Sequence, residues 1–188
     1  MEIILASSSE RRIQLMKELG LTFKVIPSNK DEFVESYNSP EDLVMQLAKI
    51  KGDSVFSEHE DDLVLGFDTL VFCNDEVLGK PQNEEDCIRM IRMLKNNKHL
   101  VVTGAYIKAK DYEESFFTEC YVHMLDIDDE SIKEYAKTKE PYDKAGGYAI
   151  QGFIGRFIDR VDGDFFTVIG LPKSSVYEKI NNYLRNKK

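Results

Sequence analysis

Cysteine and histidine are scarce in this sequence, and tryptophan is absent. Its 188 residues include three cysteines, three histidines and no tryptophan. Cys73, Cys87 and Cys120 stand far apart and are odd in number, which excludes a disulfide framework and a cysteine zinc motif. The histidines are equally scattered, and no histidine-containing metal motif can be written from them. These absences predict a reducing, cytoplasmic compartment.

Long apolar runs and an excess of basic charge are absent as well. No run approaches the roughly 20 residues of a membrane span, and the first apolar run, residues 3–6, is too short for a signal peptide. There are 25 lysines and arginines against 34 acidic residues, so the net charge is −9. This balance argues against a nucleic-acid polymer or a membrane surface as the partner. A small anion held by a local basic cluster remains compatible with it.

Two nucleotide-binding motifs are also missing. The sequence has no GxxxxGK[ST] and no GxGxxG, which argues against a Walker-type NTPase and a Rossmann dehydrogenase. What is present has an ordinary globular composition, with 42% hydrophobic and 31% charged residues. We expect a single domain over residues 1–188, built as one body or as two small lobes that share a core.

The first 20 residues predict a strand, a serine-rich loop and a helix. Residues 3–6 are an apolar strand, Ser7 to Ser9 form the loop, and a helical pattern follows over residues 10–19. Free N–H groups at a helix N-terminus bind anions. Arg11 and Arg12 would oppose the helix dipole there unless an anion lies between them. The alternative is that both arginines point into solvent.

Caps and periodicity predict the remaining elements. Helices are expected to begin after Ser7 (with Glu10 completing a capping box), Ser39, Asn83, Asp128, and Ser174 or Ser175. Strands are expected at residues 23–27, 62–73, 100–108, 115–124, 153–161 and 165–169, with another starting at Tyr148.

An aspartate interrupts the most apolar strand. Asp68 and Thr69 lie in the run from residue 62 to residue 73. Burying an unpaired charge is costly, so Asp68 is either a salt-bridged or bulged core residue or a functional one, and we favour function. Lys80 follows the next hairpin and can return toward Asp68. Lys51 stands at the border of a helix's apolar stripe, where a lysine usually extends to water.

Two further stretches carry charge. Asp31 and Glu32 form an acidic loop that either ligates a hard cation or is a solvated turn. Residues 140–152, EPYDKAGGYAIQG, place Asp143 and Lys144 before a glycine pair that brings backbone close to a ligand or only makes a turn. Several cations with a few carboxylates suit a polyphosphate and a divalent ion.

Seven short motifs, in order, carry a resemblance to a known family. They are LASSSERR (residues 5–12), AKIKG (48–52), FDT (67–69), GKP (79–81), VTG (102–104), EPYDKAGGYAIQG (140–152) and GLP (170–172). The sequence resembles the Maf family of nucleoside triphosphate pyrophosphatases, also called septum-formation proteins. Its YxIQG form is similar to the branch that acts on dTTP and UTP.

The resemblance implies a fold, an activity and a cofactor. The fold would be α/β, a mixed sheet flanked by helices, with two lobes around a central nucleotide-binding cleft. The enzyme would hydrolyse the α–β phosphoanhydride, with a divalent cation, Mg²⁺ or alternatively Mn²⁺, and could form a homodimer. Two rival functions stay open: a purine or modified-nucleotide pyrophosphatase, and a nucleotide-sensing regulator of cell division without turnover.

The resemblance also implies roles for individual residues. Asp68 matches the catalytic aspartate, and whether it accepts a proton from water or holds the metal stays open. Arg11, Thr69 and Gln151 match substrate-discriminating residues, and Arg12, Lys51 and Lys80 match triphosphate-binding residues. Glu32 falls near an acid of the family and is the second metal ligand that the resemblance implies. Two positions depart from the family pattern: Glu10 replaces the usual proline, and Gly52 replaces the usual alanine.

Overall fold

A computed structural model describes residues 1–30 and 33–187 of the chain. The chain divides into two compact units, each assembled from separate stretches of sequence. Unit 1 contains Met1–Asp68, Thr103–Thr118 and Gly170–Lys188. Unit 2 contains Thr69–Val102 and Glu119–Ile169.

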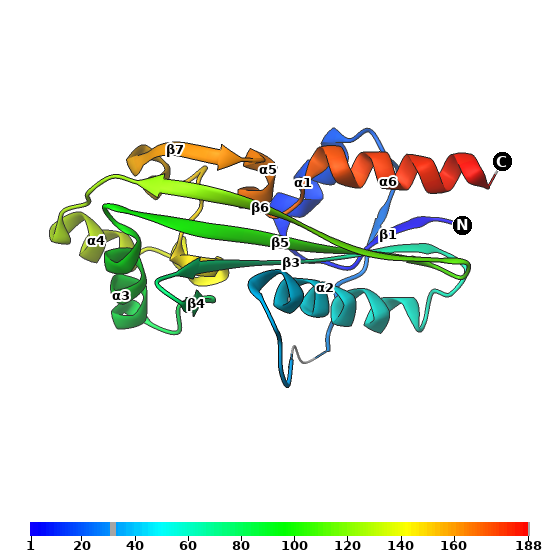
Figure 1. Cartoon of the computed structure of the whole chain (residues 1–188), viewed down its shortest axis with the longest axis horizontal. Coiled ribbons are helices and arrows are strands. Elements are labelled where there is room, and N and C mark those ends of the chain that lie inside the picture. Colours follow the sequence, from blue (N-terminus) through cyan, green and yellow to red (C-terminus); the bar gives the residue numbers. More distant parts are fainter. Residues whose placement is uncertain (31–32, 188) are drawn as a thin grey trace. The chain divides into compact units, whose positions relative to one another are not determined.

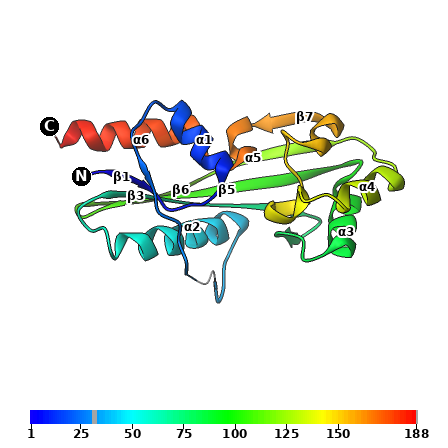
Figure 2. The ribbon, with the colours of Figure 1, turned by 180° about the vertical axis from the view of Figure 1, so that it is seen from behind.

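Unit 1 is a sheet with helices on both faces. Its strands follow the order β2-β1-β3-β5-β6. Their bounds are β1 Ile3–Leu5, β2 Lys24–Val25, β3 Leu63–Cys73, β5 Asn97–Ala109 and β6 Tyr112–Met124, the last three continuing into unit 2. β1 runs parallel to both β2 and β3. In both views α2 (Pro40–Phe56) lies on one side of these strands, and α1 (Glu10–Glu18) and α6 (Lys173–Asn186) lie on the other (Figures 1 and 2).

Close packing fixes α2 on the sheet of unit 1. Ser39 caps the helix by accepting a hydrogen bond from the backbone N–H of Asp42 (3.2 Å). A Cβ at Gly66 or at Gly104 would overlap a backbone carbonyl of α2, so the helix backbone rests directly on the strands. A Cβ at Gly52 would overlap the Tyr106 ring, which gives this departure from the family pattern a packing role.

Unit 2 has its own strands, helices and core. β3 pairs antiparallel with β4 (Glu76–Leu78) through a turn at Asn74 and Asp75, whose φ values of +51° and +62° confirm the predicted hairpin. β5, β6 and β7 (Ile158–Gly163) follow on the other side of β3. Its helical elements are α3 Glu84–Leu94, α4 Asp129–Ala136, α5 Phe165–Ile169 and the 3₁₀ turns η1 Pro141–Asp143, η2 Ala145–Gly147 and η3 Phe153–Phe157. α3 and α4 lie side by side (Figures 1 and 2).

The core of unit 2 contains the apolar face of α3. Asn83 caps α3 by accepting from the Asp86 N–H (2.9 Å), and Asp128 caps α4 in the same way. The apolar face of α3 is buried among strand residues; it consists of Cys87, Met90, Ile91 and Leu94. The mixed sheet flanked by helices agrees with the predicted fold class.

Of the two strands predicted near the C-terminus, the first is wrong in its first half and the second is wrong throughout. Phe153–Phe157 is a 3₁₀ helix, and only Ile158–Gly163 is strand. Residues 165–169 are helical because Asp164 starts a turn: its Oδ1 accepts from the Phe166 N–H at 3.1 Å, and its carbonyl accepts from the Thr167 N–H at 3.0 Å. Local bonding from one aspartate outweighs the strand preference of aromatic and β-branched residues.

Three smaller predictions are also wrong. No strand begins at Tyr148, because the chain turns through η2 and η3 there. The N-cap of α1 is Ser9, whereas the Ser7 hydroxyl accepts from the Ser9 N–H at 3.2 Å within the loop. α6 begins after Pro172, without a serine cap. Within the described ranges, no helix is long and apolar enough to cross a membrane.

Candidate functional site

Asp68 and Lys51 form a buried ion pair in unit 1. Asp68 is 7% exposed, and its Oδ1 accepts a hydrogen bond from Lys51 Nζ on α2. The position of Lys51 at the edge of the apolar stripe predicted that its side chain extends into water. This prediction is wrong, because the side chain is paired with Asp68. A buried ion pair contributes little net stability, because desolvation opposes the attraction of the charges. The pair is compatible with a salt-bridged core aspartate and equally with a carboxylate held in place for chemistry.

Arg12 joins three of the sequence motifs within unit 1. Its Nε donates to the Gly170 carbonyl at 2.8 Å, and its Nη1 lies 3.4 Å from the Ser7 hydroxyl. The guanidinium also stands 6.0 Å from the centre of the Phe67 ring. LASSSERR, FDT and GLP therefore meet at one side chain. Arg11 lies beside Arg12 in the first turn of α1 and is half-buried.

The other predicted substrate residues belong to unit 2. Thr69 directly follows Asp68 in β3 and is half-buried. Lys80 is exposed after β4, where its carbonyl accepts from the Gln82 side chain at 3.0 Å. Gln151 is exposed in the turn between η2 and η3. The predicted residues thus fall into two groups, one on each unit.

The glycine pair of unit 2 contacts the GKP motif. Gly146 and Gly147 have φ values of +68° and +70°, where other residues are strained. The Gly146 N–H donates to the Gly79 carbonyl at 2.9 Å, and a Cβ at Gly147 would stand 2.9 Å from Pro81. The close approach that requires these glycines is therefore to another part of the chain.

Lys144 and Asp143 are engaged with their own segment. Lys144 Nζ pairs with the Asp143 carboxylate and donates to the Glu140 carbonyl at 2.6 Å. These two charges, considered for a polyphosphate site, thus pair with one another locally.

Sequence reasoning missed a buried polar contact beside the Gln151 turn. His99 and Tyr148 are 1% and 6% exposed, and His99 Nε2 lies 2.6 Å from the Tyr148 hydroxyl. Burial lowers the pKa of His99 to about 4, and it raises the pKa of Tyr148. No local pattern points to this pair, because β5 and the turn are joined only by tertiary packing.

The predicted metal ligands are described only in part. Asp31 and Glu32 lie outside the described residues. Over residues 1–30 and 33–187, no three His, Cys, Asp or Glu side chains gather as for a metal ion. The assignment of Asp68 as a metal ligand therefore stays a prediction.

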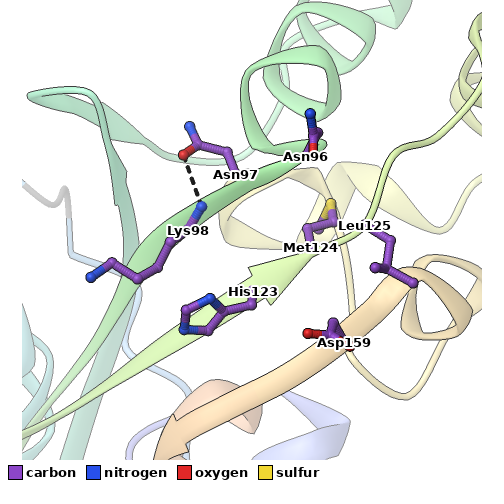
Figure 3. Close-up of a pocket in the computed structure, with 7 residues that line it drawn as sticks. All are labelled: Asn96, Asn97, Lys98, His123, Met124, Leu125 and Asp159. Atoms are coloured by element: carbon purple, nitrogen blue, oxygen red, sulfur yellow. Dashed lines mark hydrogen bonds between the residues drawn. The ribbon is translucent and has the colours of Figure 1, made fainter.

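A separate surface pocket lies on unit 2 (Figure 3). Its volume is about 370 Å³. It is lined by Asn96, Asn97, Lys98, His123, Met124, Leu125 and Asp159. None of the predicted site residues is among them. The His123 ring is already bonded to Asp162 at 2.7 Å, and the Asn97 side chain accepts from the Lys98 N–H at 2.8 Å.

Relatives with known names match almost the whole chain. A dTTP/UTP pyrophosphatase of Caldicellulosiruptor bescii is 45% identical over 90% of this chain and 88% of its own length. The dTTP/UTP pyrophosphatase of Caldicellulosiruptor saccharolyticus is 41% identical over 91% of this chain and 89% of its own. One from Bacillus cereus is 39% identical over 97% of this chain and 95% of its own.

Solved structures with the same fold are more distant in sequence. The Staphylococcus aureus Ham1 protein superposes with a TM-score of 0.55 at 14% identity, covering 100% of both chains. A HAM1 protein from Coxiella burnetii gives a TM-score of 0.53 at 12% identity, covering 99% of both. The family model described as Maf-like protein matches residues 2–183. The sequence motifs, the fold and these matches agree, and the chain belongs to the Maf family.

Proposed function

We propose that this protein is a nucleoside triphosphate pyrophosphatase that hydrolyses dTTP and UTP to the nucleoside monophosphate and diphosphate. Relatives of about 40% identity that bear the name dTTP/UTP pyrophosphatase support this substrate choice. The observation that carries the proposal is the buried carboxylate of Asp68 in β3, which is paired with Lys51.

Unit 1 supplies the groups that act on phosphate in this proposal. Arg11, Arg12 and Lys51 stabilise the negative charge that develops on the transferring and leaving phosphates. The Arg12 side chain is already oriented by the Gly170 carbonyl, so less rotamer freedom is lost when it binds an anion. Asp68 accepts a proton from the attacking water or ligates the cation. Lys80 of unit 2 adds a further positive charge.

Gln151 and Thr69 of unit 2 discriminate between bases in this proposal. Uracil and thymine present an N3–H donor beside carbonyl acceptors, and a glutamine amide can meet that edge with its own carbonyl and NH₂. A carboxylate offers acceptors only and suits the N1–H and N2–H₂ donors of guanine better. The exposed position of Gln151 is compatible with this contact.

We propose that a Mg²⁺ ion arrives with the nucleotide. Mg²⁺ keeps several waters and is commonly held by one or two carboxylates together with substrate phosphates. Asp68 supplies one such carboxylate, and Glu32, outside the described residues, is the proposed second. When bound, the ion neutralises charge on the phosphate oxygens; Mn²⁺ offers the same chemistry.

Compartment and assembly follow from the same proposal. Cys73, Cys87 and Cys120 are buried free thiols, and burial raises the pKa of Cys87 and of Cys120 to about 11. Such thiols are unreactive, which suits the reducing cytoplasm. We propose a nucleotide as the partner, rather than a nucleic-acid polymer or a membrane, and a homodimer as the assembly.

A nucleotide panel tests the reaction. The purified protein is incubated with dTTP, UTP, GTP, ATP and CTP and Mg²⁺, and products are separated by chromatography. We expect dTMP and diphosphate from dTTP, and no turnover in EDTA. Primary release of dTDP and orthophosphate would refute the reaction type. Preference for a purine nucleotide would support the first rival function, and nucleotide binding without turnover would support the regulator.

Changing Gln151 to Glu tests the base contact. One desolvated hydrogen bond is worth about 1–3 kcal/mol, so kcat/KM for dTTP should fall about 5- to 150-fold and the dTTP-to-GTP ratio should fall with it. Gln14→Glu, the same change at an exposed glutamine of α1, is the matched control. An unchanged ratio in folded Gln151→Glu would remove the base contact from the proposal.

A further inference from the structure

The carboxylate of Glu140 joins the two ends of residues 140–153, the segment that carries Gln151. Glu140 stands at the start of this segment, and its Oε1 accepts a hydrogen bond from the backbone N–H of Phe153 at 3.1 Å. Its Oε2 lies 3.4 Å from the same nitrogen. The two residues are 13 positions apart, and Gln151 stands two positions before the point of closure.

The same carboxylate lies against the backbone of the residue that follows Gln151. A Cβ at Gly152 would overlap Glu140 Oε1 and stand 2.6 Å from the carboxyl carbon. Gly152 has φ −101° and ψ −156°, an extended conformation that does not by itself require glycine. A side chain at this position would therefore have to displace the Glu140 carboxylate.

Tyr135 anchors this contact to the core of unit 2. Its hydroxyl lies 3.2 Å from Glu140 Oε1 and 3.0 Å from the Gly147 carbonyl, and its ring stacks on Phe153 with centroids 5.5 Å apart. Tyr135 is 1% exposed and comes from α4. Helix, carboxylate and both ends of the segment are thus connected through buried or half-buried groups.

We propose that Glu140 is a positioning residue that sets the choice of nucleobase through Gln151. An exposed glutamine can adopt many rotamers, and it reads a base well only where its backbone is held in one orientation. Glu140 holds that backbone by bonding Phe153 and packing on Gly152. The inference rests on the proposed function, because Gln151 contacts a base only if a nucleotide is the substrate.

Steady-state kinetics of Glu140→Ala test the proposal. We expect the dTTP-to-GTP ratio of kcat/KM to fall about tenfold, mainly through a higher KM for dTTP, as for a lost positioning contact. Glu140→Gln keeps an oxygen acceptor in place and should retain most of the ratio. Glu134→Ala removes an exposed glutamate of α4 paired with Lys137 and should leave the ratio unchanged.

Two double variants separate positioning from general destabilisation. Adding Glu140→Ala to Gln151→Ala should change the dTTP-to-GTP ratio of kcat/KM less than about twofold, because the Gln151 side chain that contacts the base is already absent. Gly152→Ala alone should reproduce the loss of ratio, since its Cβ displaces the carboxylate. In the Glu140→Ala background, Gly152→Ala should lower the dTTP-to-GTP ratio little further. Independent, additive effects in either cycle would overturn the proposal.

Hydrogen exchange supplies a readout that does not need activity. Peptides spanning residues 148–157 should exchange faster in Glu140→Ala than in wild type, while peptides of α3 remain unchanged. Faster exchange with an unchanged dTTP-to-GTP ratio would make Glu140 merely structural and overturn the proposal, as would unchanged exchange. A wild type inert toward every nucleotide would end the proposed function and this inference together. An active wild type whose Glu140→Ala variant keeps its ratio would end this inference alone.

Discussion

Asp68 keeps its place in β3 because Lys51 of α2 reaches its carboxylate. Both side chains are largely buried, at 9% and 13% exposed. Replacing such a pair by apolar residues is often neutral for stability, whereas removing one partner is costly. Stability therefore gives no strong reason for this pair, and a role of Asp68 in chemistry is the hypothesis to test.

Changing Asp68 to Asn tests that explanation. Asparagine keeps the shape but accepts no proton and ligates Mg²⁺ more weakly, so kcat for dTTP should fall at least about 100-fold. Asp61→Asn, an exposed aspartate just before the same strand, is the matched control and should keep full activity. Circular dichroism checks the fold of both variants. Near-normal kcat in a folded Asp68→Asn protein would return Asp68 to the role of a core ion pair.

His99 makes the stability of the protein depend on pH. In the unfolded chain its pKa has the ordinary value near 6.5, and burial lowers it to about 4 in the folded protein. Between these values the unfolded state binds a proton that the folded state refuses. Stability present above pH 6.5 is therefore lost as the pH falls toward 4, by up to about 3 kcal/mol.

Urea unfolding from pH 7 to pH 4.5 measures this loss. His99→Gln can still bond the Tyr148 hydroxyl but does not titrate, so its free energy of unfolding should change less across the range than that of wild type. Equal slopes for wild type and His99→Gln would contradict the assignment.

At the scale of elements, the packing of α2 on the sheet depends on the glycines that its backbone contacts. Gly104→Ala would drive a Cβ into the Val44 carbonyl of the helix. Overpacking costs about 1–3 kcal/mol, and the shift of α2 should also separate Lys51 from Asp68 and lower kcat. Gly79→Ala, which meets nothing within 4 Å, should leave stability unchanged. Thermal unfolding compares them; a Gly104→Ala protein as stable as wild type would mean that α2 can move without penalty.

The elements that sequence reasoning located have local causes. α2 and α3 begin at side-chain caps, and the turn at Asn74 carries left-handed residues. The elements that it mistook depend on less visible signals. Residues 165–169 look like a strand until Asp164 is recognised as the start of a helical turn. The turn that carries Gln151 is held by Glu140, 13 residues from its partner in sequence, and no local preference reports such a contact.

The candidate site was predictable in its residues more than in its contacts. The interrupted apolar run singled out Asp68, and the family resemblance supplied the roles. The bond from Lys51 requires α2 to lie on the sheet. Gly66 and Gly104 allow this close packing, but their presence in the sequence does not predict it. The engagement of Lys144 with Asp143 is local, but the sequence does not show whether these side chains pair with each other or face solvent.

At the scale of the whole molecule, three strands belong to both units. β3, β5 and β6 each continue from one unit into the other, and the first division falls between Asp68 and Thr69. If one unit unfolds, the shared strands lose their hydrogen bonds in that unit, and backbone groups near the division become exposed in the other unit as well. We therefore expect the chain to unfold as a single domain in one cooperative transition.

Calorimetry and two matched variants test the single transition. The calorimetric and van't Hoff enthalpies of wild type should agree, and far-UV circular dichroism and tyrosine absorbance should give one midpoint. Gly104→Ala destabilises unit 1, and Leu94→Ala removes a fully buried side chain from the core of unit 2, at a cost of about 2–5 kcal/mol. Each variant should lower the same midpoint, because neither unit is expected to persist once the shared strands are lost. Two separate transitions, with each variant moving only its own, would show instead that the units fold independently, and the active residues would then be divided between two domains.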